Sequence, residues 1–319
     1  MTVSDSRSAA PRVLHTAQAL VDVVIEVPAM PPRGGNVHAE RSTAYAGGAV
    51  TILVAAARFG ARAVHGGTVG TGPHGDLIRE ALSGDGVELV TDPVPDVDTG
   101  PCYVLLEPSG ERTFVVTFGA ERAVTAEDFA RLEPRPGDWL CVSGYTLLDV
   151  TRDALLTFLD TVPDGVQVVL DPGAPFADLP PEVIERMLRR TTLWTSNAAE
   201  ARQLTGRDHL GDAAAVLRRR LAPGAVVVLR DGEDGCHVHC SGRGTHVPGF
   251  PQRAIDTNGA GDTHTGALLA ELIRGSDWEE AALRANAAAA LKVTRRGPVT
   301  GPTRAEVEAF LEGSDEEQH

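Results

Sequence analysis

The chain has 319 residues, of which 42% are hydrophobic, and its 44 acidic residues outnumber the 29 basic ones to give a formal charge of −15. This composition is sufficient for a sizeable core in one large α/β domain or two smaller ones, and it argues against a disordered protein. An acidic surface repels phosphate backbones, so the charge also argues against nucleic acid as a partner.

The start of the chain and its cysteines bear on where the protein works. The N-terminal sequence MTVSDSRSAAPRV lacks the apolar core of a signal peptide. No apolar run approaches the roughly 20 residues that a membrane helix needs. Four cysteines do not make a disulfide framework in a chain of this length. We therefore expect a soluble, cytoplasmic protein with reduced thiols and no membrane partner.

Residues 1–11 and 313–319 are polar, small or charged, so we expect flexible tails around one domain at 12–312. Within it, two regions at about 20–45 and 98–118 are rich in strand formers and turns and show no long helical pattern. In the second region, two β-branched and aromatic runs flank the turn at 108–110 and predict a hairpin. We expect these two regions to form a small β-sheet that acts as a lid.

The rest of the chain alternates short β-branched runs with stretches rich in Ala, Leu and Arg. Buried parallel strands are predicted at Trp139–Val142, Val168–Leu170 and Ala225–Leu229. Helices are predicted at Thr151–Leu159, Pro181–Arg190, Ala198–Leu204, Ala213–Leu221 and Thr263–Arg274. This rhythm predicts an α/β protein with three layers, α/β/α, around a doubly wound, mostly parallel sheet.

The run Ile255–Thr263 reads IDTNGAGDT and leads into an apolar helix. The small residues Gly259, Ala260 and Gly261 let the backbone approach a ligand, and amides at a helix start favour an anion. Asp262 follows at once. A carboxylate beside an anion-binding turn suits phosphoryl transfer, because the amides stabilise the moving phosphate while the carboxylate accepts the proton of the attacking hydroxyl. The alternative is an Asn-Gly turn followed by an acid in the first helical turn, where acids are favoured.

Four motifs, in order, resemble those of the ribokinase-like (PfkB) carbohydrate kinases. The run Asp256–Asp262 resembles the C-terminal signature of that family, and Gly47-Gly48 its N-terminal Gly-Gly segment. Ser196–Glu200 resembles its Asn-x-x-Glu motif, and Asn286–Ala290 the stretch near its adenine site. The resemblance covers about residues 13–312. It implies a ribokinase-like fold with a small β-sheet lid and an ATP-dependent kinase of a small sugar or sugar-like substrate.

The resemblance also implies a role for particular residues. It makes Asp262 the general base and the amides of Gly259, Ala260 and Gly261 the anion hole for the γ-phosphate of ATP. It implies Mg²⁺ organised by Asn197 and Glu200, partly through water, and a monovalent cation such as K⁺ at Asp256 and the backbone near Gly297. Nucleotide contacts are implied for Asn197, Arg230, Gly232, Gly235, Asn258 and Asn286. The residues expected to contact the substrate are Asp22, Gly47, Gly48, Thr51 and Arg112.

The substrate half departs from the family pattern. After the Gly-Gly pair the family usually carries an Asn that contacts the sugar, whereas Thr51 in this chain supplies one hydrogen bond and not both those of an amide. Arg112, in the hairpin, would suit an acidic or phosphorylated acceptor, or it is simply solvated. On spacing alone, Asn197 and Glu200 also fit a helix N-cap and its capping-box partner. We expect an active kinase with an unusual acceptor.

Two other functions stay open at this point: a nucleoside (adenosine-like) kinase on the same scaffold, and a catalytically silent ligand-binding or regulatory protein. The run Cys236–Cys240, CHVHC, fits a strand, where alternate side chains face opposite ways, so its cysteines and histidines do not all bind one metal ion. Exposed edges of the lid would favour a homodimer through the lid.

Overall fold

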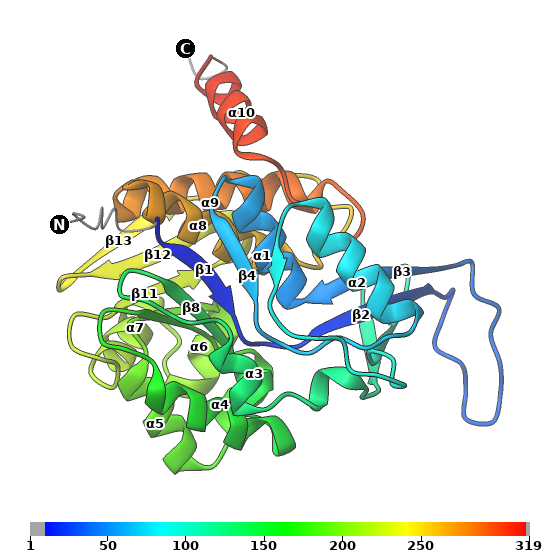
Figure 1. Cartoon of the computed structure of the whole chain (residues 1–319). Coiled ribbons are helices and arrows are strands. Elements are labelled where there is room, and N and C mark those ends of the chain that lie inside the picture. Colours follow the sequence, from blue (N-terminus) through cyan, green and yellow to red (C-terminus); the bar gives the residue numbers. More distant parts are fainter. Residues whose placement is uncertain (1–9, 317–319) are drawn as a thin grey trace.

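The computed structural model describes residues 10–316, which form a large sheet covered by helices on both faces and a smaller sheet beside it (Figure 1). Within these residues the large sheet has nine strands in the order β13-β12-β11-β10-β9-β8-β1-β4-β5. Its strands from β11 to β5 are parallel, and β12 and β13 extend it antiparallel at one edge. The predicted doubly wound, mostly parallel sheet is confirmed. The strands are β1 (Arg12–His15), β4 (Arg62–His65), β5 (Glu88–Leu89), β8 (Trp139–Ser143), β9 (Gln167–Asp171), β10 (Leu193–Asn197), β11 (Val226–Arg230), β12 (Gly235–Cys240) and β13 (Arg243–Pro248).

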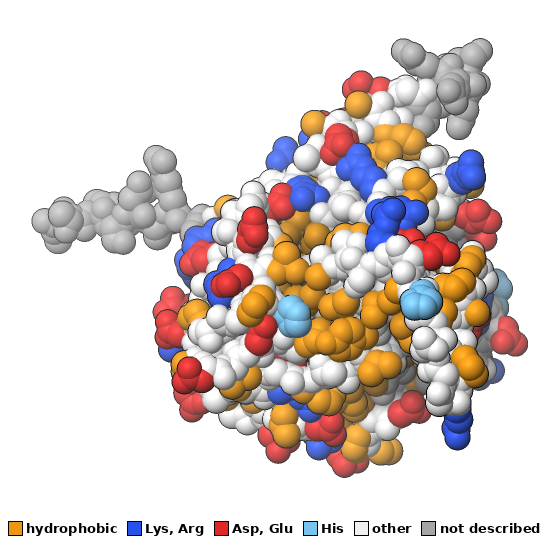
Figure 2. All heavy atoms as spheres, turned by 90° about the vertical axis from the view of Figure 1, so that its right-hand side faces the viewer, with side chains coloured by type: hydrophobic (Ala, Val, Ile, Leu, Met, Phe, Trp, Pro, Cys, Tyr) orange, Lys and Arg blue, Asp and Glu red, His pale blue; other side chains and the backbone are white. Residues whose placement is uncertain are grey.

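The small sheet has the order β3-β2-β6-β7 and draws its strands from the two regions predicted for it. These strands are β2 (Ala19–Glu26), β3 (Arg41–Gly48), β6 (Pro101–Leu106) and β7 (Arg112–Val116). Figure 2 views the molecule from the side on which this sheet lies, and hydrophobic side chains gather in the middle of that face. The strand β7 leaves Phe114, Val115 and Val116 largely exposed. The small sheet therefore presents apolar side chains to the solvent.

Two sets of helices cover the large sheet. On one face lie α1 (Ala49–Arg58), α2 (Pro73–Gly84), α8 (Ala260–Arg274), α9 (Trp278–Val293) and α10 (Arg304–Glu316). On the other lie α3 (Ala126–Ala130), α4 (Asp149–Thr161), α5 (Pro181–Arg190), α6 (Ala198–Thr205) and α7 (Leu210–Arg218). Short 3₁₀ turns are η1 (Ala120–Arg122), η2 (Gly144–Leu147), η3 (Ala174–Asp178) and η4 (Gly232–Asp234).

The strands supply both cores because successive side chains of a strand face opposite layers. Val169 and Val228 pack with the α1, α8 and α9 layer, whereas their chain neighbours Leu170 and Val227 pack with the α4–α7 layer. Each parallel strand is therefore apolar on both faces, as the runs of Val and Leu in the sequence indicate.

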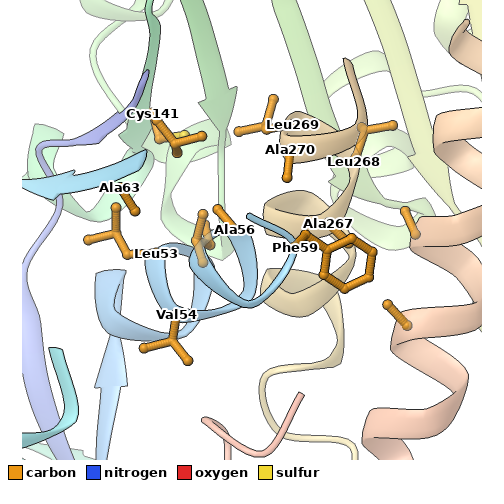
Figure 3. Close-up of a cluster of buried hydrophobic side chains, with 14 of the residues drawn as sticks. Leu53, Val54, Ala56, Phe59, Ala63, Cys141, Ala267, Leu268, Leu269 and Ala270 are labelled. Atoms are coloured by element: carbon orange, nitrogen blue, oxygen red, sulfur yellow. The ribbon is translucent and has the colours of Figure 1, made fainter. Parts of the chain in front are cut away.

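Helix α8 lies directly against α1. A Cβ atom added to Gly266 would lie 2.4 Å from the main-chain oxygen of Ile52, so the two backbones approach as closely as glycine allows. Figure 3 shows Phe59, the C-terminal cap residue of α1, near Ala267 of α8. This packing fixes the N-terminus of α8, where the predicted catalytic turn stands, on a rigid part of the molecule.

The two ends of the described chain differ in how they match the prediction. Strand β1 begins at Arg12, as expected, and residues 1–9 of the predicted N-terminal tail lie outside the described residues. Helix α10 continues to Glu316, so residues 313–316, expected in the C-terminal tail, are helical. The side chain of Val307, in the first half of α10, is buried in the core. The helix continues for several residues beyond it. Across residues 10–316, no helix is both long enough and apolar enough to span a bilayer.

Candidate active site

Polar residues end four adjacent parallel strands of the large sheet. Strands β8 and β9 end in Ser143 and Asp171, which are register partners. Strands β10 and β11 end in Asn197 and Arg230, which are also register partners. Ligands of doubly wound folds bind in the crevice outside the carboxyl ends of the strands. This edge of the sheet is therefore the candidate site.

Two cavities meet at this edge. The lid-side cavity, of about 560 Å³, lies between the small sheet and the strand ends, and Asp262 is among its lining residues. The α9-side cavity, of about 420 Å³, lies between α9, the start of α8 and the η4 turn. Arg230 and Gly261 line both cavities. The arrangement can hold two small ligands end to end, with the start of α8 at their junction.

The turn before α8 is held by its own polar groups. The Oδ1 atom of Asp256 accepts from the amide of Asn258 at 2.9 Å, and Gly259 then takes a φ of 78°. A Cβ atom on Gly259 would lie 2.7 Å from the main-chain oxygen of Pro298, so glycine is required there. The amide of Ala260 donates back to Thr257 at 3.3 Å.

Within residues 10–316, no side chain caps the N-terminus of α8, whose N-cap residue is Gly259. The amides of the first helical turn have no acceptor within the helix itself. Because the amide of Ala260 is used inside the turn, those of Gly261 and Asp262 are the better placed for an anion. Of the three amides predicted to form the anion hole at residues 259–261, that of Ala260 is thus already engaged within the turn.

The carboxyl group of Asp262 has a strongly raised pKa, of about 7. Burial is the largest cause, and the neighbouring carboxylates of Asp171, Asp22 and Glu200 add to it, while the charge of Arg230 opposes it. A general base works best when its pKa lies near the operating pH. The environment of Asp262 therefore suits proton transfer at neutral pH.

Arg230 ties the strand ends to α8. Its guanidinium group donates to Asp171 Oδ2 at 3.1 and 3.2 Å, and to Thr265 Oγ1 at 2.8 Å. It also donates to Thr195 Oγ1 at 3.1 Å and to the main-chain oxygen of Gly261 at 3.3 Å. Sequence reasoning predicted Arg230 as a nucleotide contact and missed Asp171. The signal was available, because Asp171 directly follows a predicted strand at the binding edge of the sheet.

The small sheet brings Asp22 to the lid-side cavity. Its Oδ2 atom accepts from Asn258 Nδ2 at 3.1 Å, and burial raises its pKa. A Cβ atom on Gly47 would lie 2.7 Å from the same oxygen, so the missing side chain makes room for this carboxylate, and Gly48 lines the cavity. Asn258, predicted among the nucleotide contacts, instead lies with Asp22 on the lid side.

Two residues predicted to contact the substrate point elsewhere. Thr51 is buried in α1, 2% exposed, next to the turn at Gly259, and Ile52 lines the lid-side cavity instead. Arg112 stands at the start of β7, where its Nη2 atom donates to Asp256 Oδ1 at 2.9 Å. This ion pair holds the guanidinium group away from the lid-side cavity. Neither Thr51 nor Arg112 is therefore among the residues that line that cavity, as the predicted substrate contacts would require.

The α9-side cavity contains most of the predicted nucleotide contacts. Its lining includes Asn197, Gly232, Gly235 and Asn286. Asn286 Nδ2 donates to two main-chain oxygens at the end of β13, and its Oδ1 atom lies 3.1 Å from Nε2 of His264.

His264 also lines this cavity and was not singled out from the sequence. Burial lowers its pKa to about 3, so the ring is neutral and donates from Nε2 to the oxygen of Asn286. The alanines 289 and 290 form an apolar wall beside it. A mostly apolar cavity with a few fixed polar groups fits the base and sugar of a nucleotide.

Asn197 and Glu200 form the capping box that spacing alone allowed. Asn197 Oδ1 accepts from the amide of Glu200 at 2.8 Å, and Glu200 Oε2 accepts from the amide of Asn197 at 3.0 Å. Among the described residues, no three His, Cys, Asp or Glu side chains form a ready metal cage. Mg²⁺ is commonly held by one or two carboxylates together with phosphate oxygens, and Glu200 and Asp171 are suited to that arrangement.

The residues around Asp256 do not fit a monovalent metal ion. Oδ1 of Asp256 accepts from Arg112 and from the Asn258 amide, and Oδ2 accepts from the amide of Gly297 at 2.9 Å. The main-chain oxygen of Asp256 accepts from Nζ of Lys292 at 2.8 Å. A K⁺ ion needs such oxygens for its own shell and would be repelled by the two neighbouring cations. The oxygens of Asp256 that were expected to hold K⁺ therefore already accept from protein donors.

Comparison with known proteins gives the family of the chain. The model of the pfkB family carbohydrate kinases matches residues 12–305. The chain is 31% identical over 298 residues to the uncharacterized sugar kinase YegV of Escherichia coli K12, covering 92% of each chain. It is 29% identical to the ribokinase of Bacillus subtilis strain 168, over 91% of this chain and 96% of that one.

Solved structures show the same fold. The aminoimidazole riboside kinase of Salmonella enterica, complexed with aminoimidazole riboside and an ATP analog, matches with a TM-score of 0.76 at 26% identity, covering 94% of this chain and 99% of that one. The Arabidopsis thaliana ribokinase complexed with ribose and ATP matches with a TM-score of 0.79 at 24% identity, covering 95% and 99%. The chain belongs to the pfkB family of carbohydrate kinases, which are phosphotransferases that act on an alcohol group.

Proposed function

We propose that this protein transfers the γ-phosphate of ATP to a hydroxyl group of a small uncharged sugar bound in the lid-side cavity. The observation that carries the proposal is the junction of two cavities at Arg230 and Gly261, where Asp262, with a pKa of about 7, faces one of them. The α9-side cavity is the place for the nucleotide, and its phosphates would reach the start of α8.

In this proposal Asp262 accepts the proton of the substrate hydroxyl as that oxygen bonds to the γ-phosphorus and the bond to the bridging oxygen of ADP breaks. ATP and Mg²⁺, when bound, supply the phosphoryl group and neutralise part of its charge. The amides of Gly261 and its neighbours stabilise the charge that develops on the phosphoryl oxygens. Arg230 positions the start of α8 through its hydrogen bond to the oxygen of Gly261.

The charges of the lid-side cavity favour an uncharged acceptor. Four carboxylate residues line it, against one arginine among the described residues; they are Asp22, Asp171, Glu200 and Asp262, with Arg230 as the arginine. This surplus repels a sugar phosphate or a sugar acid. Arg112, the cation that could have attracted one, is bound to Asp256. Hydroxyl groups, in contrast, donate well to carboxylates such as Asp22.

A nucleoside is the second candidate for the acceptor. The lid-side cavity has an apolar wall that includes Leu20, Phe114 and Val116, which suits the flat face of a base attached to the sugar. The similarity to an aminoimidazole riboside kinase supports this candidate as well. An apolar lid over the hydroxyl would also exclude water, which competes as acceptor.

A panel of acceptors tests the proposal. ADP release is measured with ATP and Mg²⁺ in the presence of neutral pentoses and hexoses, nucleosides, sugar phosphates and sugar acids. We expect release with members of the first two groups only. The same compounds are tested for a rise in melting temperature with a non-hydrolysable ATP analogue. Binding without ADP release from any compound would favour the silent ligand-binding protein, and a preference for charged sugars would contradict the assignment of the cavity.

The pH dependence of kcat/KM tests the role of Asp262. Its pKa is raised to about 7, so the carboxyl group holds a proton below that pH and cannot act as a base. We expect kcat/KM to fall about tenfold for each pH unit below about 7 and to level off above it. The total concentrations of Mg²⁺ and ATP are adjusted at each pH, so that the concentration of the magnesium complex of ATP stays constant. Constant activity down to the ordinary pKa range of aspartate would contradict the assignment.

A further inference from the structure

The chain contains 29 basic side chains, of which 28 are arginines and one, Lys292, is a lysine. Lys292 lies in α9 and is completely buried, with 0% of its surface exposed. A lysine ammonium is a compact point charge, whereas a guanidinium is larger and planar. All the remaining basic positions are arginines. The one lysine of the chain thus stands at an interior position, where a small cation fits.

The ammonium group of Lys292 lies behind the catalytic turn. Nζ donates to the main-chain oxygen of Asp256 at 2.8 Å, and Asp256 is the residue from which the turn to Gly259 begins. Burial lowers the pKa of Lys292 to about 8, while the charge of Asp256 works in the opposite direction, so the group remains charged at neutral pH. Burying an ammonium costs several kcal/mol unless nearby acceptors offset it. An apolar side chain would fill the same space without that cost, so stability alone does not explain this lysine.

A second fixed cation reaches Asp256 from another layer. Arg112 of β7 pairs with its carboxylate across 144 positions of sequence. The carboxylate is further held by the amides of Asn258 and Gly297. Asp256 is thus held by α9 on its main-chain oxygen and by the small sheet on its side chain. Any change at this residue would shift the turn that carries Gly259 and the amides after it.

We infer that Lys292 is a built-in monovalent cation: together with Arg112 it takes the place of a K⁺ ion at Asp256, so this enzyme needs no monovalent metal ion for activity. Lys292 acts through Asp256 and is a positioning residue, since it touches the turn and not the lid-side cavity. The inference rests on the proposed kinase function only for its activity readout. Its other readouts do not need turnover.

The unmodified protein provides the first test. ADP release is compared in potassium chloride and in choline chloride of equal ionic strength, and we expect the same rate in both. The melting temperature is measured in the same two salts and should also be unchanged. Activation of several-fold by K⁺, or a specific stabilisation by it, would overturn the inference.

A spectroscopic test works even if no acceptor is found. Because the sequence has one lysine, protein labelled with ¹³C at the lysine ε-carbon gives a single side-chain signal. We expect the signal of a charged ammonium at neutral pH, and no movement when potassium replaces choline. A neutral amine, or a signal that shifts and saturates with K⁺, would overturn the inference. A protein that shows no turnover but passes this test would refute the proposed function and not the built-in cation.

Variants of Lys292 separate a compact charge from ordinary packing. Lys292→Ala is expected to lower kcat by about 10²-fold, the effect of misplacing catalytic groups by about 1 Å, and K⁺ or ammonium ions should restore part of the loss. Lys292→Arg keeps the charge but not its size, and is expected to lose activity as well. Leu291→Met, on the same helix, is the packing control. Full activity of a folded Lys292→Ala without added cation, or a loss that neither ion restores, would overturn the inference.

Discussion

Asp262→Asn is expected to lower kcat by about 10²–10⁴-fold, the usual contribution of a general base. The amide has nearly the shape of the carboxylate, so binding of the acceptor and of ATP should change little. It cannot accept the proton of the substrate hydroxyl. The measurement is kcat and KM for both substrates, together with the affinity for each from thermal shifts.

The stability of the same variant gives an independent check. The pKa of Asp262 is raised from 3.8 to about 7, so ionising this carboxyl group destabilises the folded protein relative to the unfolded chain. The destabilisation is fully present above about pH 7 and declines as the pH falls from there toward the ordinary pKa of aspartate. We therefore expect Asp262→Asn to melt at a higher temperature than the unmodified protein at pH 8, with a smaller difference at pH 6. An inactive variant that is more stable has not lost activity by unfolding. Turnover close to that of the unmodified protein would refute the assignment of the base.

Arg230→Met is expected to lower the free energy of unfolding by about 3 kcal/mol, the effect of removing one partner from a buried ion pair. Arg230 and Asp171 have side chains that are 13% and 21% exposed, and their atoms approach to 3.1 Å. Without the guanidinium, the carboxylates of Asp171, Glu200 and Asp262 repel one another with no cation between them. Urea denaturation at pH 8 measures the loss.

The loss of Arg230 should also move the pH profile. Its charge lowers the pKa of Asp262, so that pKa should rise above 7 in Arg230→Met, and activity should then disappear at a higher pH. Arg230→Lys keeps the positive charge but lacks the planar guanidinium group. Its stability and its pH profile should lie between those of the unmodified protein and those of Arg230→Met. Arg243→Met, whose side chain is 78% exposed, is the control and should change neither quantity. An unchanged stability and an unchanged pH profile in Arg230→Met would contradict the arrangement described.

The local pattern of the sequence predicted most elements of the large sheet and its helices. The predicted helix at 181–190 has the bounds of α5, and the predicted run at 168–170 lies inside β9. The helix expected at 213–221 begins earlier, at Leu210, and ends at Arg218. Leu221 continues its apolar periodicity, but Pro223 follows closely, and residues just before a proline leave the helical conformation. Strands and helices were predictable because they depend on neighbouring residues.

The turn that we propose to be catalytic was also predictable, because it is a continuous run. Small residues, a helix start and a carboxylate stand side by side at 256–262, and the structure places that turn between the two cavities. The resemblance to one family gave several of the polar residues that line them, among them Asp22, Asn197 and Arg230. His264 was missed because it becomes part of the site only when α8 and α9 are assembled, whereas Asp171 could have been found from its place directly after a predicted strand.

By itself, the sequence determined the fold class, the two sheets and the turn at α8, since these follow from local periodicity and from one continuous motif. Only the tertiary structure decided which side chains meet in the site. Asn258 reaches Asp22 across 236 positions, and Arg112 reaches Asp256 across 144, so neither contact leaves a local pattern. The physical reason is that a charged or polar side chain goes to the partner that the folded backbone brings within hydrogen-bonding distance. For Lys292 that partner is the main-chain oxygen of Asp256, which no residue pattern can specify.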